Sequence, residues 1–472
     1  MTRQTAPGFA RRVAQAAAYV FGYDAAKQTT RRKAPDRKQQ SEDKELNTAD
    51  RAAVISAARE IRRNFAIASW GIRKHLDYVA TFAFRARTPD RTFNRNLETW
   101  VERWADPANF DAAGRHSLYR WIRLAESSRT VDGDLLAIQY ADGTVGAIES
   151  DRIRTPTDAA AMTNRQAKDI THGVRTNKAG RAIEYAVHTR GDVANSFTFE
   201  RWVPARNAWL HAYYDRFDQT RGIGLLTPAI NTFRDVYEGI DYATAKAKVT
   251  QLFALVTFRQ AAEAAGLIAE EDAEDSDDPR YTVDFGAGPV HLDLEPGDDA
   301  KFLESASPPI EFQQFIQNVI AAALKGIDIP YSFYAENFSN YSGSRQALLQ
   351  YEQSADDKRR ENRYLLDRLT AWRMGLAIAD RELILPANVK QQDITWEWMP
   401  AGIPWIDPQR DITAHNTALD MRVTSRQRIC RERNVDFYDV ADELADEESY
   451  LREKKLLQAA QPTAATNQEA TE

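Results

Sequence analysis

Residues that could carry catalysis or hold a metal are scattered along this chain. No histidine pair has the H-E-x-x-H spacing of a metalloprotease, and no Cys/His cluster has the spacing of a zinc site. We therefore expect structural roles and no metal site for the histidines, which are His75, His116, His172, His188, His211, His291 and His415.

The motifs of nucleophilic and nucleotide chemistry are also missing from the sequence. It contains no G-x-S-x-G elbow and no G-x-x-x-x-G-K-[ST] phosphate loop. The one cysteine, Cys430, has no neighbouring base to activate it, and an amphipathic helix explains its position equally well. Carboxylates are numerous enough for a metal nuclease, but they recur in no spaced motif. The sequence predicts no enzyme and no cofactor.

Composition limits the class of protein further. With 472 residues, 43% of them hydrophobic, the chain can form two to four domains with real cores. Its 62 basic and 69 acidic residues give a net charge of −7, so any contact with DNA must be loose or locally basic. A single cysteine excludes an internal disulfide and suits folding in a reducing cytoplasm. We find no signal peptide and no apolar run near 18 residues, and expect no membrane partner.

The elements that must position any functional side chain centre on residues 310–372. Ser307-Pro308 and Gly326 bracket a short helix whose apolar residues recur at helical spacing. Residues 331–343 are rich in Asn, Ser and Gly and are predicted to form a loop. From Ser344 a charged helix without Pro or Gly is predicted to run to about Gly375.

The first 226 residues are predicted to combine helices with strands. Residues 1–45 form a solvated, basic arm, and Asn47 opens a helix that is followed by a second apolar helical run up to Phe84. The bulky residues of 94–124 predict a helical core rather than a binding site. Strand signals between residues 135 and 214 predict an antiparallel, half-buried sheet.

A second long helix is predicted after Thr227-Pro228, with an apolar stripe that extends to about residue 258. The insert that follows carries an acidic tract, made of Glu270, Glu271, Asp272, Glu274, Asp275, Asp277 and Asp278. Such a tract is usually a solvated loop, and this one lacks the glycine placement of an EF-hand, so no calcium site is predicted. Two helices that flank a compact insert predict a stalk with a head at its tip.

The C-terminal part is predicted to return to a strand at 393–399 and to end in a small helical unit. Asp407-Pro408, Thr424-Ser425 and Asp436 mark the helix starts. The tail from about residue 458 is polar and low in complexity, and we expect it to be disordered. The predicted fold class is α+β, mainly helical.

Two stretches together resemble a known family. Residues 210–222 (LHAYYDRFDQTRG) precede one long helix, and residues 340–349 (NYSGSRQALL) open another. They resemble the corresponding motifs of the lambda-type portal proteins of tailed phages. Residues 170–174 with 180–185, and Ile406-Asp407-Pro408, agree with the same family. The resemblance covers roughly residues 23–455.

The resemblance implies a ring, typically of twelve subunits, at one capsid vertex. Double-stranded DNA would be packaged and later ejected through this ring, which would dock terminase and head-completion or tail adaptor proteins. Further partners would be the major capsid protein and other copies of the chain. The ATPase belongs to the separate terminase, in agreement with the missing phosphate loop. The protein would be assembled in the host cytoplasm and located in the virion.

The resemblance also implies a portal-type division of the chain into named regions. These are a flexible basic arm (1–45), an α+β wing (46–226), a first stem helix (227–259), a clip (260–306), a second stem helix (307–330), a tunnel loop (331–343), a long helix behind the tunnel (344–376), a return to the wing (377–406), a helical crown (407–457) and a disordered tail (458–472).

Two sets of site residues follow from this division. The DNA channel would be lined by the tunnel loop and the start of the next helix, namely Asn337, Ser339, Asn340, Tyr341, Ser342 and Arg345. The aromatic residues Phe333, Tyr334, Phe338 and Tyr341 would anchor this loop to neighbouring helices. The acidic tract of residues 270–278 would dock terminase and adaptors.

Alternatives remain open at the level of the sequence. Lys358-Arg359-Arg360 could face DNA, although ion pairs on the helix surface are the more ordinary explanation. The loop at 331–343 could be a plain connection between helices. For the whole chain, the alternatives are a non-portal head connector or scaffold protein and a metal-dependent nucleic-acid-processing enzyme.

Overall fold

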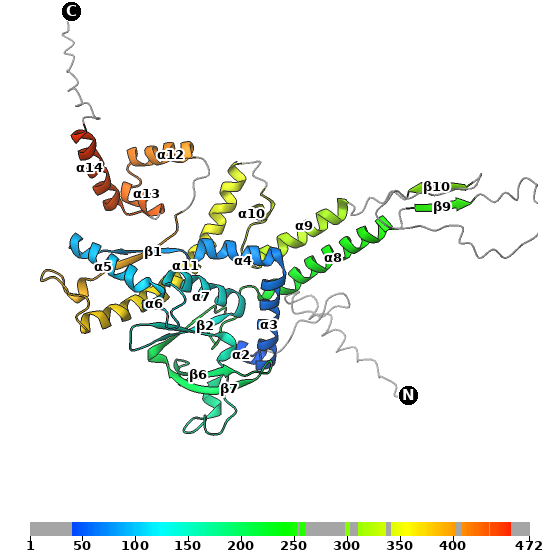
Figure 1. The fold of residues 1–472 in the computed structure, drawn as a ribbon, viewed down its shortest axis with the longest axis horizontal. Helices are drawn as coiled ribbons and strands as arrows, with labels where there is room; N and C mark the ends of the chain where they lie inside the picture. The colour runs from blue at the N-terminus through cyan, green and yellow to red at the C-terminus, as the bar shows by residue number, and fades with distance from the viewer. Residues whose placement is uncertain are drawn as a thin grey trace, which may run out of the picture.

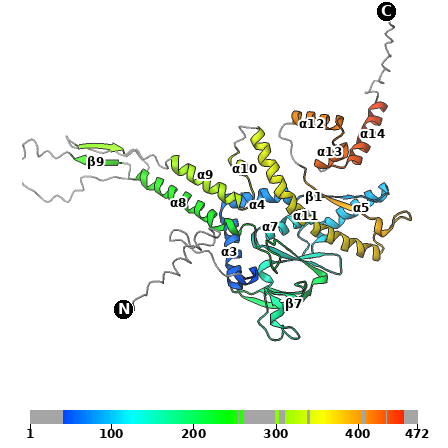
Figure 2. The same ribbon diagram turned by 180° about the vertical axis from the view of Figure 1, so that it is seen from behind.

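The computed structural model describes residues 40–252, 255–259, 298–302, 310–336, 341–402, 408–433 and 435–454. A body of helices and sheets carries a projecting helical hairpin on one side (Figure 1). A separate group of helices near the C-terminus lies above the body in the same view. The view from behind shows the same arrangement (Figure 2). The fold is α+β and mainly helical, as predicted.

The body begins with helices α2 (Glu42–Glu45), α3 (Thr48–Asn64) and α4 (Ala66–Val79). Asn47 caps α3, because its side chain accepts hydrogen bonds from the backbone N–H groups of Ala49 and Asp50 at 2.9 and 3.0 Å. The predicted second helical run to Phe84 is wrong in its last part. Strand β1 (Phe82–Ala86) follows α4 and pairs with β11 (Trp396–Pro400). Its residues alternate between buried and half-buried, as expected for a strand.

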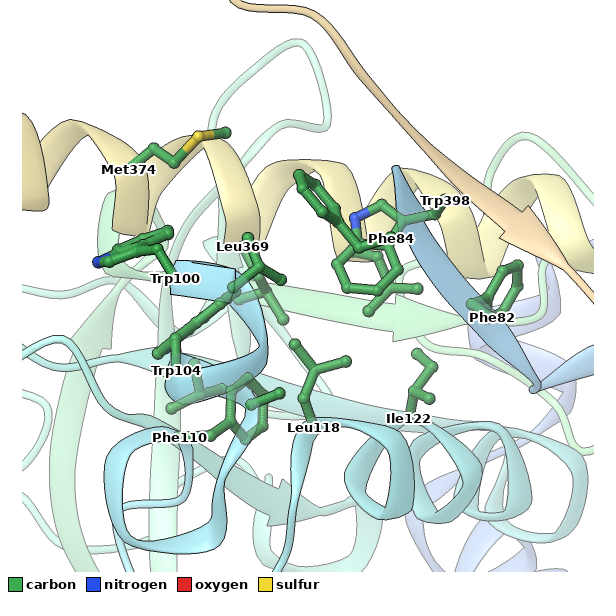
Figure 3. Packing of buried hydrophobic residues seen from close by; sticks show 14 of the residues in the cluster. Phe82, Phe84, Trp100, Trp104, Phe110, Leu118, Ile122, Leu369, Met374 and Trp398 are labelled. Atoms are coloured by element: carbon green, nitrogen blue, oxygen red, sulfur yellow. The ribbon is translucent and has the colours of Figure 1, made fainter. Parts of the chain in front are cut away.

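The bulky segment after β1 is core, as predicted. It forms α5 (Arg91–Ala105), α6 (Pro107–Phe110) and α7 (Leu118–Asp132). Trp100, Trp104 and Phe110 pack on one another, and Trp100 lies beside Met374 of the long helix α11 (Tyr341–Ala379), as Figure 3 shows. Trp398 of β11 is fully buried against Phe84 of β1, with ring centroids 5.1 Å apart.

The strands between residues 134 and 212 are antiparallel, but they form two sheets where one was predicted. Strands β2 (Asp134–Gln139), β3 (Val145–Glu149) and β8 (Ala208–Ala212) have the order β3-β2-β8. The second sheet contains β4 (Ile170–Thr171), β5 (Val174–Thr176), β6 (Ala182–Arg190) and β7 (Phe197–Pro204), in chain order. The two sheets share one apolar cluster, which includes Leu136 and Val187. Short 3-10 turns η2 (Ser150–Arg152), η3 (Ala167–Asp169) and η4 (Ala205–Asn207) connect the strands.

The projecting hairpin consists of α8 (Ile230–Leu252) and α9 (Ile310–Lys325), which lie side by side (Figure 1). The turn η5 (Thr227–Ala229) precedes α8. The predicted continuous helix to residue 259 is wrong, because α8 ends at Leu252 and residues Leu255–Arg259 form strand β9. This strand pairs with β10 (Asp298–Phe302), and its run of Leu, Val, Thr and Phe favours a strand over a helix.

The last described part contains the turn η7 (Gln391–Asp393) before β11, and then α12 (Pro408–Asp420), α13 (Arg426–Glu432) and α14 (Phe437–Glu453). Ser425 and Asp436 cap α13 and α14, as their positions in the sequence predicted. Residues 1–39 and 455–472, which hold most of the predicted arm and all of the predicted tail, lie outside the described residues.

Candidate functional site

The predicted loop at 331–343 is partly helical. Tyr331–Ala335 form helix α10, which ends at Glu336 in a left-handed conformation with φ of 49°. Helix α11 begins at Tyr341, three residues before the predicted start at Ser344. The helix tolerates Ser342 and Gly343 there, because the backbone N–H groups of a first turn need no intrahelical partner. Asn337, Ser339 and Asn340 lie outside the described residues. The structure therefore describes only the two ends of this connection.

Aromatic side chains hold α10 against the body, as predicted for Phe333 and Tyr334. The ring of Phe333 lies 6.0 Å from Tyr78 and 5.5 Å from Tyr351, measured between centroids. Tyr334 contacts the edge of Trp70 at 6.0 Å. These contacts join α10 to α4 and α11, so the start of the connection has a fixed position.

The segment between α9 and α10 is also fixed. Ile327 and Ile329 are fully buried, and a Cβ added to Gly71 would lie 2.9 Å from Ile327 Cδ1. Asp328 has a positive φ of 62° and accepts hydrogen bonds from Lys358 Nζ at 2.6 Å and Ser354 Oγ at 2.9 Å. The end of α9 is thereby joined to the middle of α11.

The basic run at 358–360 forms ion pairs, and two of its residues are buried. Lys358 binds Asp328, while Arg359 binds Glu352 at 2.5 Å and the backbone carbonyl of Tyr78 at 2.6 Å. Only Arg360 makes the predicted pairs on the helix surface, with Asp356 at 3.0 Å and Asp357 at 3.1 Å. Lys358 and Arg359 therefore hold the fold together and do not present free charge.

Arg345, the charged residue predicted for the channel, also has an acidic partner. Its Nη1 lies 2.6 Å from Asp411 Oδ1 on α12. Asp411 is buried, whereas the side chain of Arg345 is about half exposed. The pair connects the first turns of α11 to the C-terminal helices. Tyr341 and Ser342 belong to the same first turn of α11.

A buried network centred on Glu126 connects α4, α7, α11 and Tyr213, the residue that follows β8. Glu126 of α7 accepts from His75 Nε2 of α4 at 2.8 Å, from Arg129 Nε at 2.9 Å and from Tyr213 Oη at 2.5 Å. Arg129 also binds Glu361 of α11. Burial opposes ionisation of Glu126, but the charge of Arg129 outweighs it and holds the pKa of Glu126 well below its usual range.

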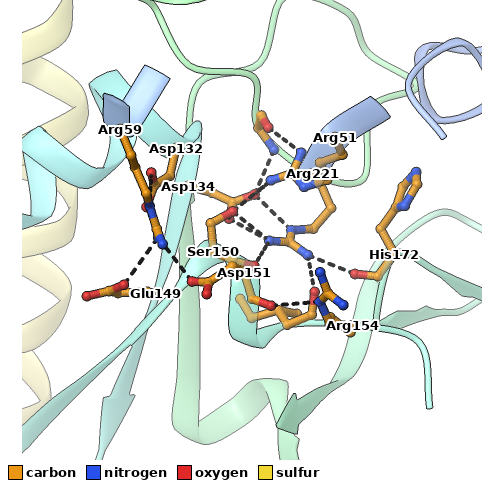
Figure 4. A network of polar contacts seen from close by, with 12 residues as sticks. Arg51, Arg59, Asp132, Asp134, Glu149, Ser150, Asp151, Arg154, His172 and Arg221 are labelled. Carbon is orange, nitrogen blue, oxygen red and sulfur yellow. Dashed lines mark hydrogen bonds and ion pairs between the residues drawn. The ribbon is translucent and has the colours of Figure 1, made fainter. Parts of the chain in front are cut away.

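A second buried network joins helix α3, both sheets and the segment before α8 (Figure 4). Asp134 Oδ1 and Oδ2 accept from Arg221 Nη2 and Nε at 2.7 and 2.8 Å, and Arg51 Nη2 lies 3.0 Å from Oδ2. Burial raises the pKa of Asp134, but the two guanidiniums outweigh it and lower the pKa to about 2. Arg221 also donates to the backbone carbonyls of Ile153, Ser150 and His172.

Gly222 completes this second network. Its N–H donates to Asp134 Oδ2 at 3.0 Å, and its carbonyl accepts from Arg51 Nη1 at 2.7 Å. A Cβ at this position would lie 2.1 Å from the carbonyl oxygen of Gly133, so no larger residue fits without a shift of the backbone. No local pattern in the sequence predicted a role for Arg51, Asp134 or Arg221. The only signal was Arg221-Gly222 at the end of the motif at residues 210–222.

The buried histidines make stability depend on pH. Burial, together with the charge of Arg129, lowers the pKa of His211 to about 3, and its Nε2 lies 2.8 Å from Asn362 Oδ1. Below about pH 6.5 the unfolded chain binds a proton at this position and the folded chain does not, so stability falls as pH falls. We expect His211 to cost about 2 kcal/mol between pH 6.5 and pH 5.

The urea midpoint of unfolding at pH 8 and at pH 5 measures this pH dependence. A His211→Gln variant should lose less stability over this interval than the natural chain, because glutamine does not titrate. His116→Gln, at a half-buried histidine, serves as the comparison variant. Equal pH dependence in the natural chain and the His211→Gln variant would contradict the assignment.

The C-terminal helices are attached to the body mainly through ion pairs. Arg87 binds Asp436, Arg85 approaches Asp439 at 3.7 Å and Arg95 lies 2.9 Å from Asp442. Within residues 408–433 and 435–454 no hydrophobic side chain is fully buried. Several are exposed instead, among them Met421, Val423, Leu444 and Tyr450. We call the contact between these three aspartates and Arg85, Arg87 and Arg95 the arginine–aspartate interface.

We expect high salt to release α14 at the arginine–aspartate interface. Exposed ion pairs contribute only about 0.2–1 kcal/mol each, and the screening length falls to about 3 Å at 1 M salt. Amide hydrogen exchange in 437–453 should therefore accelerate between low and molar NaCl. Exchange in α7, whose residues lie in the apolar core, should change little. Equal protection of α14 at both salt concentrations would contradict this expectation.

The predicted docking residues at 270–278 lie outside the described residues, so the structure does not place them. Among the described residues, no group of three or more His, Cys, Asp or Glu side chains is arranged to hold a metal ion. No helix in the described ranges is long and apolar enough to cross a bilayer.

Comparison with known proteins gives a family match and a similar phage protein. Residues 28–359 match the family model described as phage portal protein, lambda family. The probable portal protein of Halomonas phage phiHAP-1 is 22% identical over 379 residues, which cover 76% of this chain and 71% of that protein.

Two solved structures, the neck of an empty GTA particle and the virion of a native gene transfer agent particle, contain similar chains. The neck chain has a TM-score of 0.43 and 12% identity, and the match covers 79% of this chain and 92% of that one. For the virion chain the values are 0.42 and 11%, with coverage of 82% and 99%.

Proposed function

Since this chain belongs to the lambda family of phage portal proteins, we propose that twelve copies assemble side by side into a ring at one vertex of a capsid. The observation that supports the ring best is the projecting hairpin. Tyr242 of α8 and Phe315 of α9 are 70% and 60% exposed, and Tyr237 and Ile240 are also exposed. Exposed aromatic side chains on one slender element are typical of a surface that another protein covers.

The ring would conduct double-stranded DNA during packaging and ejection. The connection between α10 and α11 would line its narrow part, because the aromatic contacts of α10 and the Arg345–Asp411 pair fix both ends of this connection. Each phosphate that a protein neutralises adds affinity for DNA. A subunit with a net charge of −7, whose Lys358 and Arg359 are already paired, would let the duplex slide.

Deletion of residues 337–342 tests the role of this connection. We expect the ring to assemble normally, because α10 and α11 keep their own contacts with the body, while packaging or retention of DNA is impaired. Electron microscopy measures assembly, and nuclease-protected DNA per particle measures packaging and retention. A deletion of the same length in the exposed segment after β6, residues 191–196, is the matched control. Normal packaging and retention after deletion of 337–342 would refute the assignment.

The head of the hairpin, residues 260–306, would dock terminase and later the head-completion or tail adaptors. Because this part of the sequence lies between α8 and α9, we expect it at the tip of the hairpin, where its acidic tract at 270–278 would attract basic partner surfaces at a rate that falls with salt. Replacement of the acidic residues of 270–278 by neutral ones, followed by a terminase-binding assay, tests this electrostatic contribution to docking. Unchanged association and unchanged salt dependence would disprove it. The major capsid protein would surround the ring, assembly would take place in the host cytoplasm, and the ATP-dependent motor would be a separate protein.

Electron microscopy of the purified chain tests the proposal as a whole. A portal should show rings with a central hole, whereas a connector or scaffold protein without a channel should not. Side views should also show the hairpins projecting from one end of the ring. Particles without a central hole, at a concentration where the protein is pure and folded, would disprove the function.

A further inference from the structure

A pocket of about 470 Å³ lies between the second sheet, the start of β8 and helix α11. Three arginines surround it: Arg181 from the turn before β6, Arg206 from η4 and Arg368 from α11. Alanines, Ile183, Tyr185 and Trp209 also line it, and we call this apolar part of the lining the floor. No acidic residue lines the pocket. The chain as a whole has a net charge of −7, so the pocket is a local concentration of positive charge.

The arginines of the pocket have no carboxylate partners in the part of the chain that the structure describes. Arg181 and Arg206 are exposed and form no ion pair there, unlike Arg59 or Arg190, which each contact more than one acid. Arg368 lies over the ring of Trp209, with Cζ 4.6 Å from the centroid. The pocket therefore holds like charges whose compensation must come from solvent or from a binding partner.

The nearest acid on the same strand faces away. Glu184 of β6 pairs with Arg165 and Arg175, on the opposite side of the strand from Ile183 and Tyr185. This follows from the alternation of side chains along a strand. The arginines on one face of the sheet are thus paired with Glu184, whereas the arginines of the pocket have no acidic partner among the described residues.

The shape and the floor of the pocket indicate the class of ligand. Ile183 is 39% exposed, and Tyr364 of α11, which is 58% exposed, lies 5.4 Å from Trp209 between ring centroids. A concave apolar floor can accept one protruding side chain, whereas the convex backbone of a DNA duplex would leave it empty. Arginine and tryptophan are also the residues that most often dominate binding energy at protein interfaces.

We propose that this pocket binds an acidic peptide segment of another protein, with an aromatic or large apolar side chain of the segment on the floor and its carboxylates on Arg181, Arg206 and Arg368. Cation–π contact with Trp209 holds the Arg368 guanidinium in place before the peptide arrives, which reduces the entropy lost on binding. This function is separate from the ring and the channel, since none of the pocket residues belongs to the hairpin or to the connection between α10 and α11.

A direct binding experiment tests the proposal with the assembled full-length protein. The probes are a fluorescent glutamate–tyrosine copolymer, polyglutamate of similar length and a short DNA duplex. We expect the copolymer to bind more tightly than polyglutamate, because only the copolymer supplies rings for the floor, and to bind less tightly as salt rises. The duplex should bind more weakly than the copolymer.

Two double variants make the test specific. Arg181→Gln/Arg206→Gln removes two pocket charges and should weaken copolymer binding about tenfold, a change of about 1.4 kcal/mol. Arg103→Gln/Arg120→Gln removes two exposed arginines that do not line the pocket and should leave binding unchanged. All four arginines are exposed, and equal melting curves will show that both variants fold.

Three outcomes would overturn the proposal. One is a copolymer affinity no higher than that of polyglutamate. Another is an equal loss of binding in both double variants, which would indicate non-specific attraction. The third is tighter binding of the duplex that depends on Arg181 and Arg206, which would make the pocket part of a nucleic-acid surface.

Discussion

Replacement of Asp134 by asparagine is expected to destabilise the folded chain by about 3–5 kcal/mol, because it leaves buried arginines without their counter-charge. Asp134 is fully buried, and the side chains of Arg221 and Arg51 are 1% and 9% exposed. Neither guanidinium can turn to solvent without breaking its contacts to the backbone carbonyls of Ile153 and Gly222. The change is nearly isosteric, so the loss would come from charge and not from a cavity.

The shift in the urea midpoint at one fixed protein concentration measures this effect, since assembly also adds to apparent stability. Asp218→Asn is the matched control. The side chain of Asp218 is 45% exposed, and its one ion pair among the described residues is with Arg216, which is 48% exposed. Its replacement should therefore cost less than about 1 kcal/mol. If Asp134→Asn cost as little as Asp218→Asn, the network would not be a source of stability.

A double-variant cycle separates the pair from its surroundings. Arg221→Met removes the guanidinium and keeps much of its length. Alone, it leaves Asp134 with Arg51 as its one charged partner in the described part of the chain, and should also destabilise the protein. Together with Asp134→Asn the two changes should cost less than the sum of the single effects, because each has already removed the partner of the other. Strict additivity would show that Arg221 acts through its backbone contacts alone.

Elements with strong local signals could be predicted from the sequence. Asn47, Ser425 and Asp436 cap helices where the sequence placed them, and the apolar periodicity of α9 and the bulk of α5 to α7 identified a stalk helix and a core. The family could also be predicted, from residues 210–222 and 340–349, and the match over 28–359 confirms it.

Features that depend on distant parts of the chain could not be predicted. Strand β1 is a strand because β11, more than 300 residues away, supplies its partner, as the bond between Arg87 N and Thr395 O at 2.7 Å illustrates. The buried role of Arg221 has no local signal either. Asp134 lies 87 residues before Arg221, and Arg51 lies 171 residues before its neighbour Gly222. The positions of the channel and docking residues remain predictions, since most of them lie outside the described residues.

Glutamates at two exposed aromatic positions of the hairpin should abolish the ring. The variant Tyr242→Glu/Phe315→Glu removes two rings that are 70% and 60% exposed in the single chain and that the proposed ring would bury. Burial of one such side chain contributes about 1.5–3 kcal/mol, so each interface would lose about 4 kcal/mol, or about a thousandfold in affinity. Because each subunit meets two neighbours, this loss applies at every contact of the ring.

Sedimentation velocity at micromolar concentration in near-physiological salt measures the outcome. The natural chain should sediment as a ring and the double variant as a monomer, with equal helix content by circular dichroism, because both side chains already lie at the surface of the single chain. Ile384→Glu, at a residue that is 79% exposed outside the hairpin, adds a similar charge and should keep the ring. If the natural chain sediments as a monomer, the proposed portal ring is wrong. Rings formed by the double variant would instead show that contacts in the body, and not the aromatic face of α8 and α9, hold the subunits together.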